Sequence, residues 1–141
     1  MKKYLFSIKP FFPDLSLLFL RVYISVLMII NHGLVKLENY NSASKTFFDP
    51  FGIGSPMALN LALFAELFCS LLVIIGFMTR VALIPLIITM VVAFFIFNAA
   101  EPMIKKELPL IFLLTYIAIF VLGPGRFSLD SMLFGAGKKT V

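Results

Sequence analysis

Four long apolar segments dominate the sequence, at about residues 15–33, 57–77, 81–98 and 107–123. A helix needs about 20 residues to cross the hydrocarbon core of a bilayer, and each segment is near that length. Of the 141 residues, 61% are apolar and 13% are charged, whereas soluble domains carry about 25% charged residues. The sequence therefore predicts an all-α, polytopic membrane protein with a four-transmembrane-helix bundle. It excludes a soluble enzyme, a nucleic-acid-binding protein and a disordered chain.

The connections between the segments support one membrane domain over residues 1–141. Residues 78–80 are too few for anything but a tight turn between the second and third segments, and Thr79 is expected to cap the third helix. The Gly-Pro-Gly sequence at 123–125 is expected to end the fourth helix, because proline cannot continue a helix. The length leaves no room for a separate soluble catalytic domain.

The distribution of cations predicts the orientation in the membrane. The N-terminal segment, the turn at 78–80 and the C-terminal tail share one side and carry seven cations: Lys2, Lys3, Lys9, Arg80, Arg126, Lys138 and Lys139. The opposite side carries four: Lys36, Lys45, Lys105 and Lys106. Because loops rich in Lys and Arg stay in the cytoplasm, both termini are predicted to be cytoplasmic. The expected location is a bacterial cytoplasmic (inner) membrane.

The cysteine and histidine counts limit the cofactors. The chain has one cysteine, Cys69, and one histidine, His32. A single cysteine excludes an internal disulfide, a CxxC pair, a zinc finger and a cysteine-ligated iron–sulfur cluster within this chain. A single histidine excludes a haem held by two histidines of the chain. We therefore expect no metal site, and no haem or iron–sulfur cluster held by this chain alone.

Two ionisable residues lie near the middle of apolar segments, Arg21 in the first and Glu66 in the second. An isolated charge there would cost about 2.5–3.5 kcal/mol or more. Antiparallel packing of the two segments brings both side chains within about 5 Å of the bilayer midplane, at the rise of an α-helix. The sequence therefore predicts a buried ion pair between Arg21 and Glu66, with either a functional or a purely architectural role.

Polar residues follow one face of each of the first two segments. Helical spacing aligns two sets of residues: Arg21, Ser25, Met28 and His32 in the first, and Ala62, Glu66, Cys69 and Ser70 in the second. We expect both faces to point into the bundle. Four polar residues at segment ends would then ring an outward-facing vestibule: His32, Lys36, Asn98 and Glu107. The alternative is that these four residues are solvated or capping groups at helix ends.

The connection of residues 34–56 is the longest. It holds four aromatic residues: Tyr40, Phe47, Phe48 and Phe51. Aromatic rings favour the headgroup region of a bilayer. This connection is therefore expected either to lie on the outer membrane surface or to form a partial lid over a cavity between the helices.

Several motifs resemble the DoxX family of small four-helix membrane proteins. The Leu-Arg pair at 20–21 and the Asn-His-Gly-Leu-Val-Lys-Leu sequence at 31–37 resemble its first helix. Glu66 followed by Gly-Phe-Met-Thr-Arg at 76–80 resembles its second helix and turn, and Glu-Leu at 107–108 resembles the start of its fourth. The Gly-Pro-Gly-Arg-Phe-Ser-Leu-Asp sequence at 123–130 resembles its characteristic C-terminal sequence. Many relatives carry a histidine near the end of helix three, where this chain has Asn98.

The resemblance implies a function as well as a fold. The family takes its name from a subunit of a thiosulfate:quinone oxidoreductase, and some relatives are linked to membrane-associated oxidative-stress complexes. A subunit of a quinone-dependent oxidoreductase would bind quinone and take electrons from a partner protein. In this hypothesis Glu66 and Arg21 are the catalytic candidates. The substrate-binding candidates are His32, Lys36, Asn98 and Glu107. The expected partners are the lipid bilayer and a protein partner or a second copy of the chain, and not nucleic acid.

Two other hypotheses stay open. The chain could be a non-enzymatic scaffold or assembly subunit, in which the buried pair only fixes packing. It could also form a small-molecule or ion pathway along Arg21, Glu66 and His32.

Overall fold

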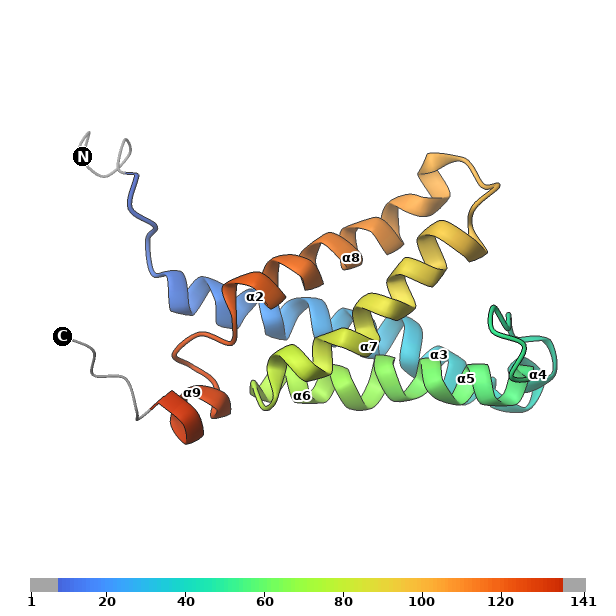
Figure 1. The fold of residues 1–141 in the computed structure, drawn as a ribbon, viewed down its shortest axis with the longest axis horizontal. Helices are drawn as coiled ribbons and strands as arrows, with labels where there is room; N and C mark the ends of the chain where they lie inside the picture. The colour runs from blue at the N-terminus through green and yellow to red at the C-terminus, as the bar shows by residue number, and fades with distance from the viewer. Residues whose placement is uncertain (1–7, 136–141) are drawn as a thin grey trace.

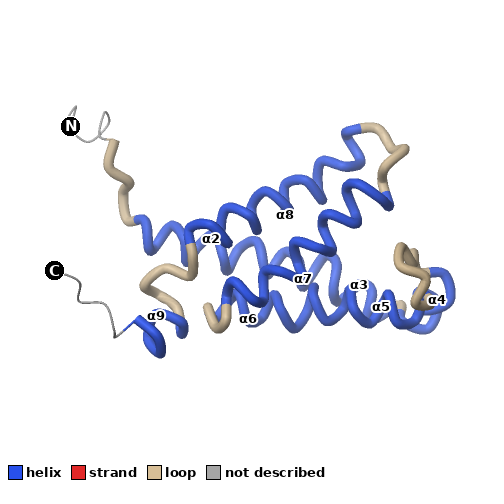
Figure 2. The backbone as a smooth tube through the Cα atoms, in the orientation of Figure 1, coloured by secondary structure: helices blue, strands red, loops and turns tan. Residues whose placement is uncertain are grey.

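The fold consists of helices that run back and forth along one axis (Figures 1 and 2). The computed structural model describes residues 8–135, and every regular element in that range is a helix. The first rod joins α2 (Pro13–Met28), a π-helical segment (Ile29–Gly33) and α3 (Leu34–Glu38). The second joins α5 (Ser55–Leu63), a π-helical segment (Phe64–Cys69) and α6 (Ser70–Ile75). The third joins α7 (Thr79–Val91) and a π-helical segment (Val92–Phe97), and the fourth is α8 (Met103–Leu122). Two short helices complete the chain, α4 (Tyr40–Thr46) and α9 (Leu129–Phe134).

Three of these rods are long and apolar enough to cross a membrane, by length and composition: Pro13–Glu38, Ser55–Ile75 and Thr79–Phe97. The fourth rod, α8, has 20 residues, and its first turns carry Lys105, Lys106 and Glu107. The all-helical class is confirmed for the described residues, whereas the membrane-spanning role of α8 stays a prediction.

The two ends of the bundle need names, because the predicted orientation in the membrane depends on them. We call the end where α2 begins and α9 lies the terminal end, and the other the opposite end (Figure 1). Four of the seven cations used to predict the orientation, Lys2, Lys3, Lys138 and Lys139, lie outside the described residues. Which side of the membrane each end faces stays a prediction.

The first rod is longer than predicted. It continues past residue 33 to Glu38, and α4 follows it, so the expected loop of residues 34–56 shrinks to residues 47–54. No glycine or proline interrupts residues 34–49, so nothing in that stretch breaks a helix early. The amide of Asn39 donates to the carbonyl of Val35 at 2.9 Å, where α3 ends and the chain turns into α4.

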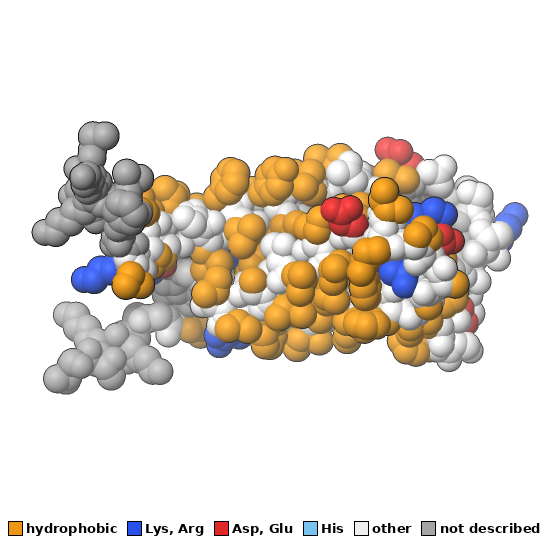
Figure 3. Space-filling view, turned by 90° about the horizontal axis from the view of Figure 1, so that it is seen from above, with side chains coloured by type: hydrophobic (Ala, Val, Ile, Leu, Met, Phe, Trp, Pro, Cys, Tyr) orange, Lys and Arg blue, Asp and Glu red, His pale blue; other side chains and the backbone are white. Residues whose placement is uncertain are grey.

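The two polar faces predicted from helical spacing do point inward. Arg21, Ser25 and Met28 are at most 1% exposed. Glu66, Cys69 and Ser70 are at most 2% exposed. Large apolar side chains instead cover much of the outer surface, and charged side chains gather mostly toward the opposite end (Figure 3). An apolar outer surface of this kind suits contact with lipid.

Gly33 sets the distance between the first and second rods. A Cβ atom at this position would lie 2.4 Å from Cδ2 of Leu67 and 3.5 Å from the carbonyl carbon of Glu66. Only glycine permits this close approach without moving Leu67. Lys36 follows three residues later and therefore projects from the same face of the first rod, toward Glu66.

Candidate functional site

The two buried charges do not pair with each other, so the predicted Arg21–Glu66 ion pair is wrong. Glu66 instead pairs with Lys36, whose Nζ lies 2.5 Å from Oε1 and 2.6 Å from Oε2. The Glu66 side chain is 2% exposed and that of Lys36 is 26% exposed. The longer first rod is the physical reason, because it brings Lys36 within reach of Glu66 beside the close approach at Gly33.

Arg21 belongs to a different site at the terminal end. Its Nη1 donates to the carbonyl oxygen of Pro124, and its Nη2 donates to that of Phe127 at 2.8 Å. Both acceptors belong to residues 123–130, which fold back over the end of the first two rods. We call this segment the C-terminal clamp. It surrounds a buried cation with backbone dipoles, which is an architectural arrangement.

The C-terminal clamp also caps the third rod. The carboxylate of Asp130 accepts hydrogen bonds from the backbone N–H groups of Met78 at 2.7 Å and Thr79 at 2.8 Å. The N–H of Asp130 in turn donates to the carbonyl of Gly76 at 2.8 Å. The prediction that Thr79 caps α7 is wrong, because Asp130 supplies the capping oxygens from 51 residues away.

A cavity of about 540 Å³ lies between the rods beside the Lys36–Glu66 pair. This volume falls within the usual range for small-molecule sites, about 300–1,000 Å³. All three π-helical segments contribute to its wall, and π-helical turns are frequent at functional sites. Most of the wall is apolar and aromatic. Its aromatic members are Phe47, Phe48, Phe51, Phe64, Phe97 and Phe112.

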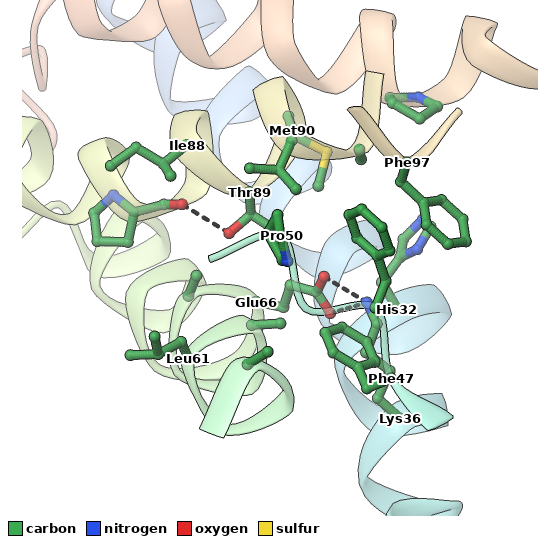
Figure 4. A pocket seen from close by; sticks show the side chains of 18 of the residues that line it. His32, Lys36, Phe47, Pro50, Leu61, Glu66, Ile88, Thr89, Met90 and Phe97 are labelled. Carbon is green, nitrogen blue, oxygen red and sulfur yellow. Dashed lines mark hydrogen bonds and ion pairs between the residues drawn. The ribbon is translucent and has the colours of Figure 1, made fainter. Parts of the chain in front are cut away.

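Residues 47–54 form a lid over this cavity, which favours the second of the two expectations for this connection. Five lid residues line the cavity: Phe47, Phe48, Pro50, Phe51 and Ile53. Pro50 lies between Thr89 of α7 and Glu66 (Figure 4). The ring of Phe48 contacts that of Phe97 on the third rod, with centroids 5.3 Å apart.

Asp49 holds the lid in shape. Its carboxylate accepts from the N–H of Gly54 at 2.6 Å and from that of Phe51 at 3.1 Å. These backbone donors, Gly54 foremost, hold the pKa of Asp49 below its ordinary value, because they stabilise the charged carboxylate. Asp49 therefore stabilises the conformation of the lid through hydrogen bonds to two backbone N–H groups of the lid itself.

Polar groups are few in the cavity and lie along part of its wall. Besides the Lys36–Glu66 pair they include His32, whose Nε2 is buried and has no hydrogen-bond partner among the described residues. The His32 ring packs edge-on against Phe112, with centroids 5.4 Å apart. Asn98 donates from its side-chain amide to the carbonyl of Ala93 at 2.7 Å. The hydroxyl of Thr89 donates to the carbonyl of Pro85 at 2.8 Å.

The structure brings together four of the six predicted site residues. His32, Lys36 and Glu66 line the cavity (Figure 4). Asn98 also lines it. Arg21 and Glu107 are not among the lining residues. Glu107 is exposed on α8, and that helix contributes Pro109 and Phe112 to the cavity. The predicted vestibule ring is therefore wrong for Glu107.

Thr89 and the face of α7 that lines the cavity are not predicted from the sequence. A serine or threonine in an apolar helix was the available signal, but such residues are more often bonded to their own helix. Among the described residues, no group of three or more His, Cys, Asp and Glu side chains is placed to hold a metal ion. The site therefore offers hydrogen-bond donors, one carboxylate and a largely apolar wall.

Comparison with known proteins identifies a family. The model of the family described as DoxX matches residues 16–99, which is more than half of the chain. The match contains the cavity residues His32, Lys36, Glu66 and Asn98, and it ends before α8 and the C-terminal clamp. No curated protein and no solved structure matches the chain.

Proposed function

Because the chain belongs to the DoxX family, we propose that it is the membrane subunit of a quinone-linked oxidoreductase and that its cavity binds the quinone. The single observation that carries this proposal is the cavity itself. It is an apolar, aromatic enclosure in a small integral membrane protein, and its wall holds an ammonium–carboxylate pair and a His32 nitrogen without a hydrogen-bond partner in the part of the chain that the structure describes. We also propose that the chain crosses a bacterial inner membrane four times and that both of its termini are cytoplasmic.

The residues present fit a quinone. A quinone ring is flat and apolar and carries two carbonyl oxygens, which require hydrogen-bond donors when they leave water. His32 offers a ring nitrogen and Lys36 an ammonium group, and aromatic side chains such as Phe47 and Phe97 offer flat apolar contacts. The donor set and the enclosure therefore match both parts of the molecule.

Each polar residue has a distinct role in this proposal. A bound quinone supplies two-electron, two-proton redox chemistry, with electrons delivered by a partner redox protein. His32 and Lys36 bind the carbonyl oxygens and orient the ring. Glu66 holds a proton at its carboxylate or returns to its pairing with Lys36. We assign Arg21 an architectural role, because its guanidinium donates to the C-terminal clamp and does not line the cavity.

The lipid phase is the proposed route of access. Three cavity residues on the second and third rods are also about half exposed on the outer surface: Leu61 at 53%, Ile88 at 50% and Phe97 at 61%. The cavity therefore reaches a flank of the bundle that would face lipid tails. A ring with an apolar tail could occupy the cavity while its tail remains in the bilayer.

Binding of tailed quinones to the protein in lipid nanodiscs tests the proposal. We expect saturable binding of a benzoquinone or naphthoquinone with an alkyl tail. His32→Ala or Lys36→Met should weaken it about tenfold, the effect of losing about 1.4 kcal/mol of hydrogen bonding. Lys105→Gln is the matched control, because Lys105 is exposed and pairs with Glu101. Absence of binding, or equal binding by all variants, would contradict the proposal.

A further inference from the structure

Four buried hydroxyl groups make no hydrogen bond of normal geometry among the described residues. One belongs to Thr79 at the terminal end, and the other three belong to Ser25, Ser70 and Tyr116 within the bundle, each 0% exposed. Burying a hydroxyl without a hydrogen-bond partner destabilises a folded protein. Buried polar groups in folded proteins are nearly always paired, either with protein or with ordered water. Ser25 therefore lacks a partner among the described residues, and Ser70 and Tyr116, whose hydroxyls lie close together, leave further hydrogen-bonding capacity unused.

Two hydroxyls elsewhere in the bundle show how a hydroxyl within a helix is usually hydrogen-bonded. Thr89 donates to the carbonyl of Pro85 at 2.8 Å, and Thr115 donates to that of Ile111 at 2.7 Å. In both cases the acceptor is the carbonyl four residues earlier, the common arrangement for Ser and Thr within a helix. Ser25 and Ser70 lie within helices and make no such bond. Their hydroxyls are available to another group.

Contacts between the rods place the three hydroxyls at intermediate levels. At the terminal end Arg21 lies beside Gly76, where an added Cβ would be 3.0 Å from Nη1. Further along, Gly33 lies beside Glu66. Ser25 and Ser70 lie between these two levels on the facing sides of the first and second rods.

Tyr116 completes the series from the fourth rod. It lies one turn beyond Phe112, whose ring packs against His32 beside the cavity. Its hydroxyl is within reach of a side-chain hydrogen bond to Ser70 and within electrostatic range of the Glu66 carboxylate. At the other end of the series the Nε of Arg21 is buried and also lacks a partner. Unsatisfied polar groups therefore lead from Glu66 to Arg21 through the centre of the bundle.

We propose that these groups line a file of internal water molecules that joins Glu66 to Arg21 and exchanges protons with the Glu66 carboxylate. Internal waters typically make about three hydrogen bonds to otherwise unsatisfied groups, and this stretch offers such groups on three rods. A proton that enters from bulk water at the terminal end passes between neighbouring water oxygens and arrives at a carboxylate oxygen of Glu66. Arg21 stays charged and borders the file at its terminal end, with Asp130 the nearest acid. The titratable groups that face Glu66 are Lys36 and Tyr116, and His32 lies near Lys36.

Water-edited solid-state NMR of the protein in lipid bilayers tests for the waters. With labelled serine, threonine and tyrosine, we expect water magnetisation to reach the side chains of Ser25, Ser70 and Tyr116 at a rate similar to that of exposed Ser42. The matched control is Thr115, whose hydroxyl is bonded to its own helix and should receive magnetisation several-fold more slowly. Transfer to the three interior residues as slow as to Thr115 would overturn the proposal.

Time-resolved infrared spectroscopy after a pH jump tests the proton exchange. The carboxylate band of Glu66 is assigned by its loss in Glu66→Gln. Tyr116→Phe keeps the ring and removes the hydroxyl, and Ser70→Ala is a second variant. Each should slow protonation of Glu66 at least tenfold, whereas Thr115→Val should not change it. Unchanged rates in both variants would overturn the proposal. Neither residue lines the cavity, so this result is independent of quinone binding.

Discussion

Arg21 and Glu66 are each 1% exposed, yet the two regions that surround them satisfy a buried charge in opposite ways. The guanidinium of Arg21 donates to two backbone carbonyls of the C-terminal clamp, which is itself bonded to the turn between the second and third rods. Glu66 meets a single side chain, Lys36, at the wall of a cavity of about 540 Å³.

The two regions differ in how freely the partner of the buried charge can move. Backbone carbonyls are fixed by the chain around them, so the C-terminal clamp holds Arg21 in one place. The Lys36 side chain has four rotatable bonds and is a quarter exposed, so it can leave Glu66 for another acceptor. The terminal end is therefore suited to holding the rods together, and the cavity is suited to exchanging one polar partner for another.

The largest expected effect tests the C-terminal clamp as a structural element. Gly76 has φ +73°, and an added Cβ would lie 2.5 Å from Cβ and 2.9 Å from Cα of Ser128. Gly76→Ala must therefore strain the turn and displace the clamp, at a cost of about 2–4 kcal/mol. Unfolding in detergent measures this loss. Gly52→Ala is the control. Gly52 has φ +70°, and an added Cβ there would meet nothing within 4 Å, so the loss in this variant measures the cost of the positive φ alone. Equal losses in both variants would show that the clamp contributes nothing.

The next effect tests the Lys36–Glu66 pair. Removing one member of a buried ion pair costs about 3–5 kcal/mol, and the partial exposure of Lys36 lowers this to about 1–3 kcal/mol for Glu66→Gln or Lys36→Met. The double variant Lys36→Met with Glu66→Gln leaves no unpaired charge and should recover most of the loss. A double-mutant cycle of unfolding free energies measures the coupling. Additive losses would mean that the two side chains do not interact.

A smaller effect tests the cap on α7. Asp130→Ala removes both acceptors of the Met78 and Thr79 N–H groups and should cost about 1 kcal/mol. Asp130→Asn keeps one acceptor oxygen and should cost less. Both variants should leave quinone affinity unchanged, since Asp130 is remote from the cavity. A fall in affinity that matches the stability loss would remove the functional separation between the two regions.

The smallest effect is local and depends on pH. The pKa of Asp49 is lowered in the folded protein, so its stabilisation of the lid is complete above the ordinary value of about 4 and is lost as pH falls through the lowered value. We expect the amide proton shift of Gly54 to be constant near neutral pH and to move only in strong acid. Asp49→Asn should remove this titration. A transition near neutral pH would contradict the assignment of Asp49 as the group that closes the lid.

The helices and their inward faces could be predicted because they depend on local properties. Apolar length and helical spacing are visible in the chain, and both placed Arg21, Ser25, Glu66 and Ser70 in the interior. A lid over a cavity was one of two expectations because its aromatic residues are equally visible. These features need no knowledge of how the rods approach one another.

The partners of the two charges could not be predicted in the same way. Arg21 bonds to backbone carbonyls 103 and 106 residues away, and a backbone carbonyl has no signature in the sequence. Lys36 lay beyond the predicted helix end. Each π-helical segment adds a residue to a helical turn. The side chains that follow it therefore point in different directions from those that ideal α-helical spacing predicts. Glu107 was misplaced for a related reason, because Pro109 and Phe112 set a different face of α8 toward the cavity.

Equilibrium binding of one tailed quinone to four forms of the protein in nanodiscs tests the central claim most directly. The forms are the wild type, His32→Ala, Lys36→Met and Asp130→Ala. We expect His32→Ala and Lys36→Met each to raise the Kd about tenfold, while Asp130→Ala, which disturbs only the C-terminal clamp, leaves the Kd unchanged. A Kd that responds to Asp130→Ala and not to His32→Ala or Lys36→Met would contradict the proposal.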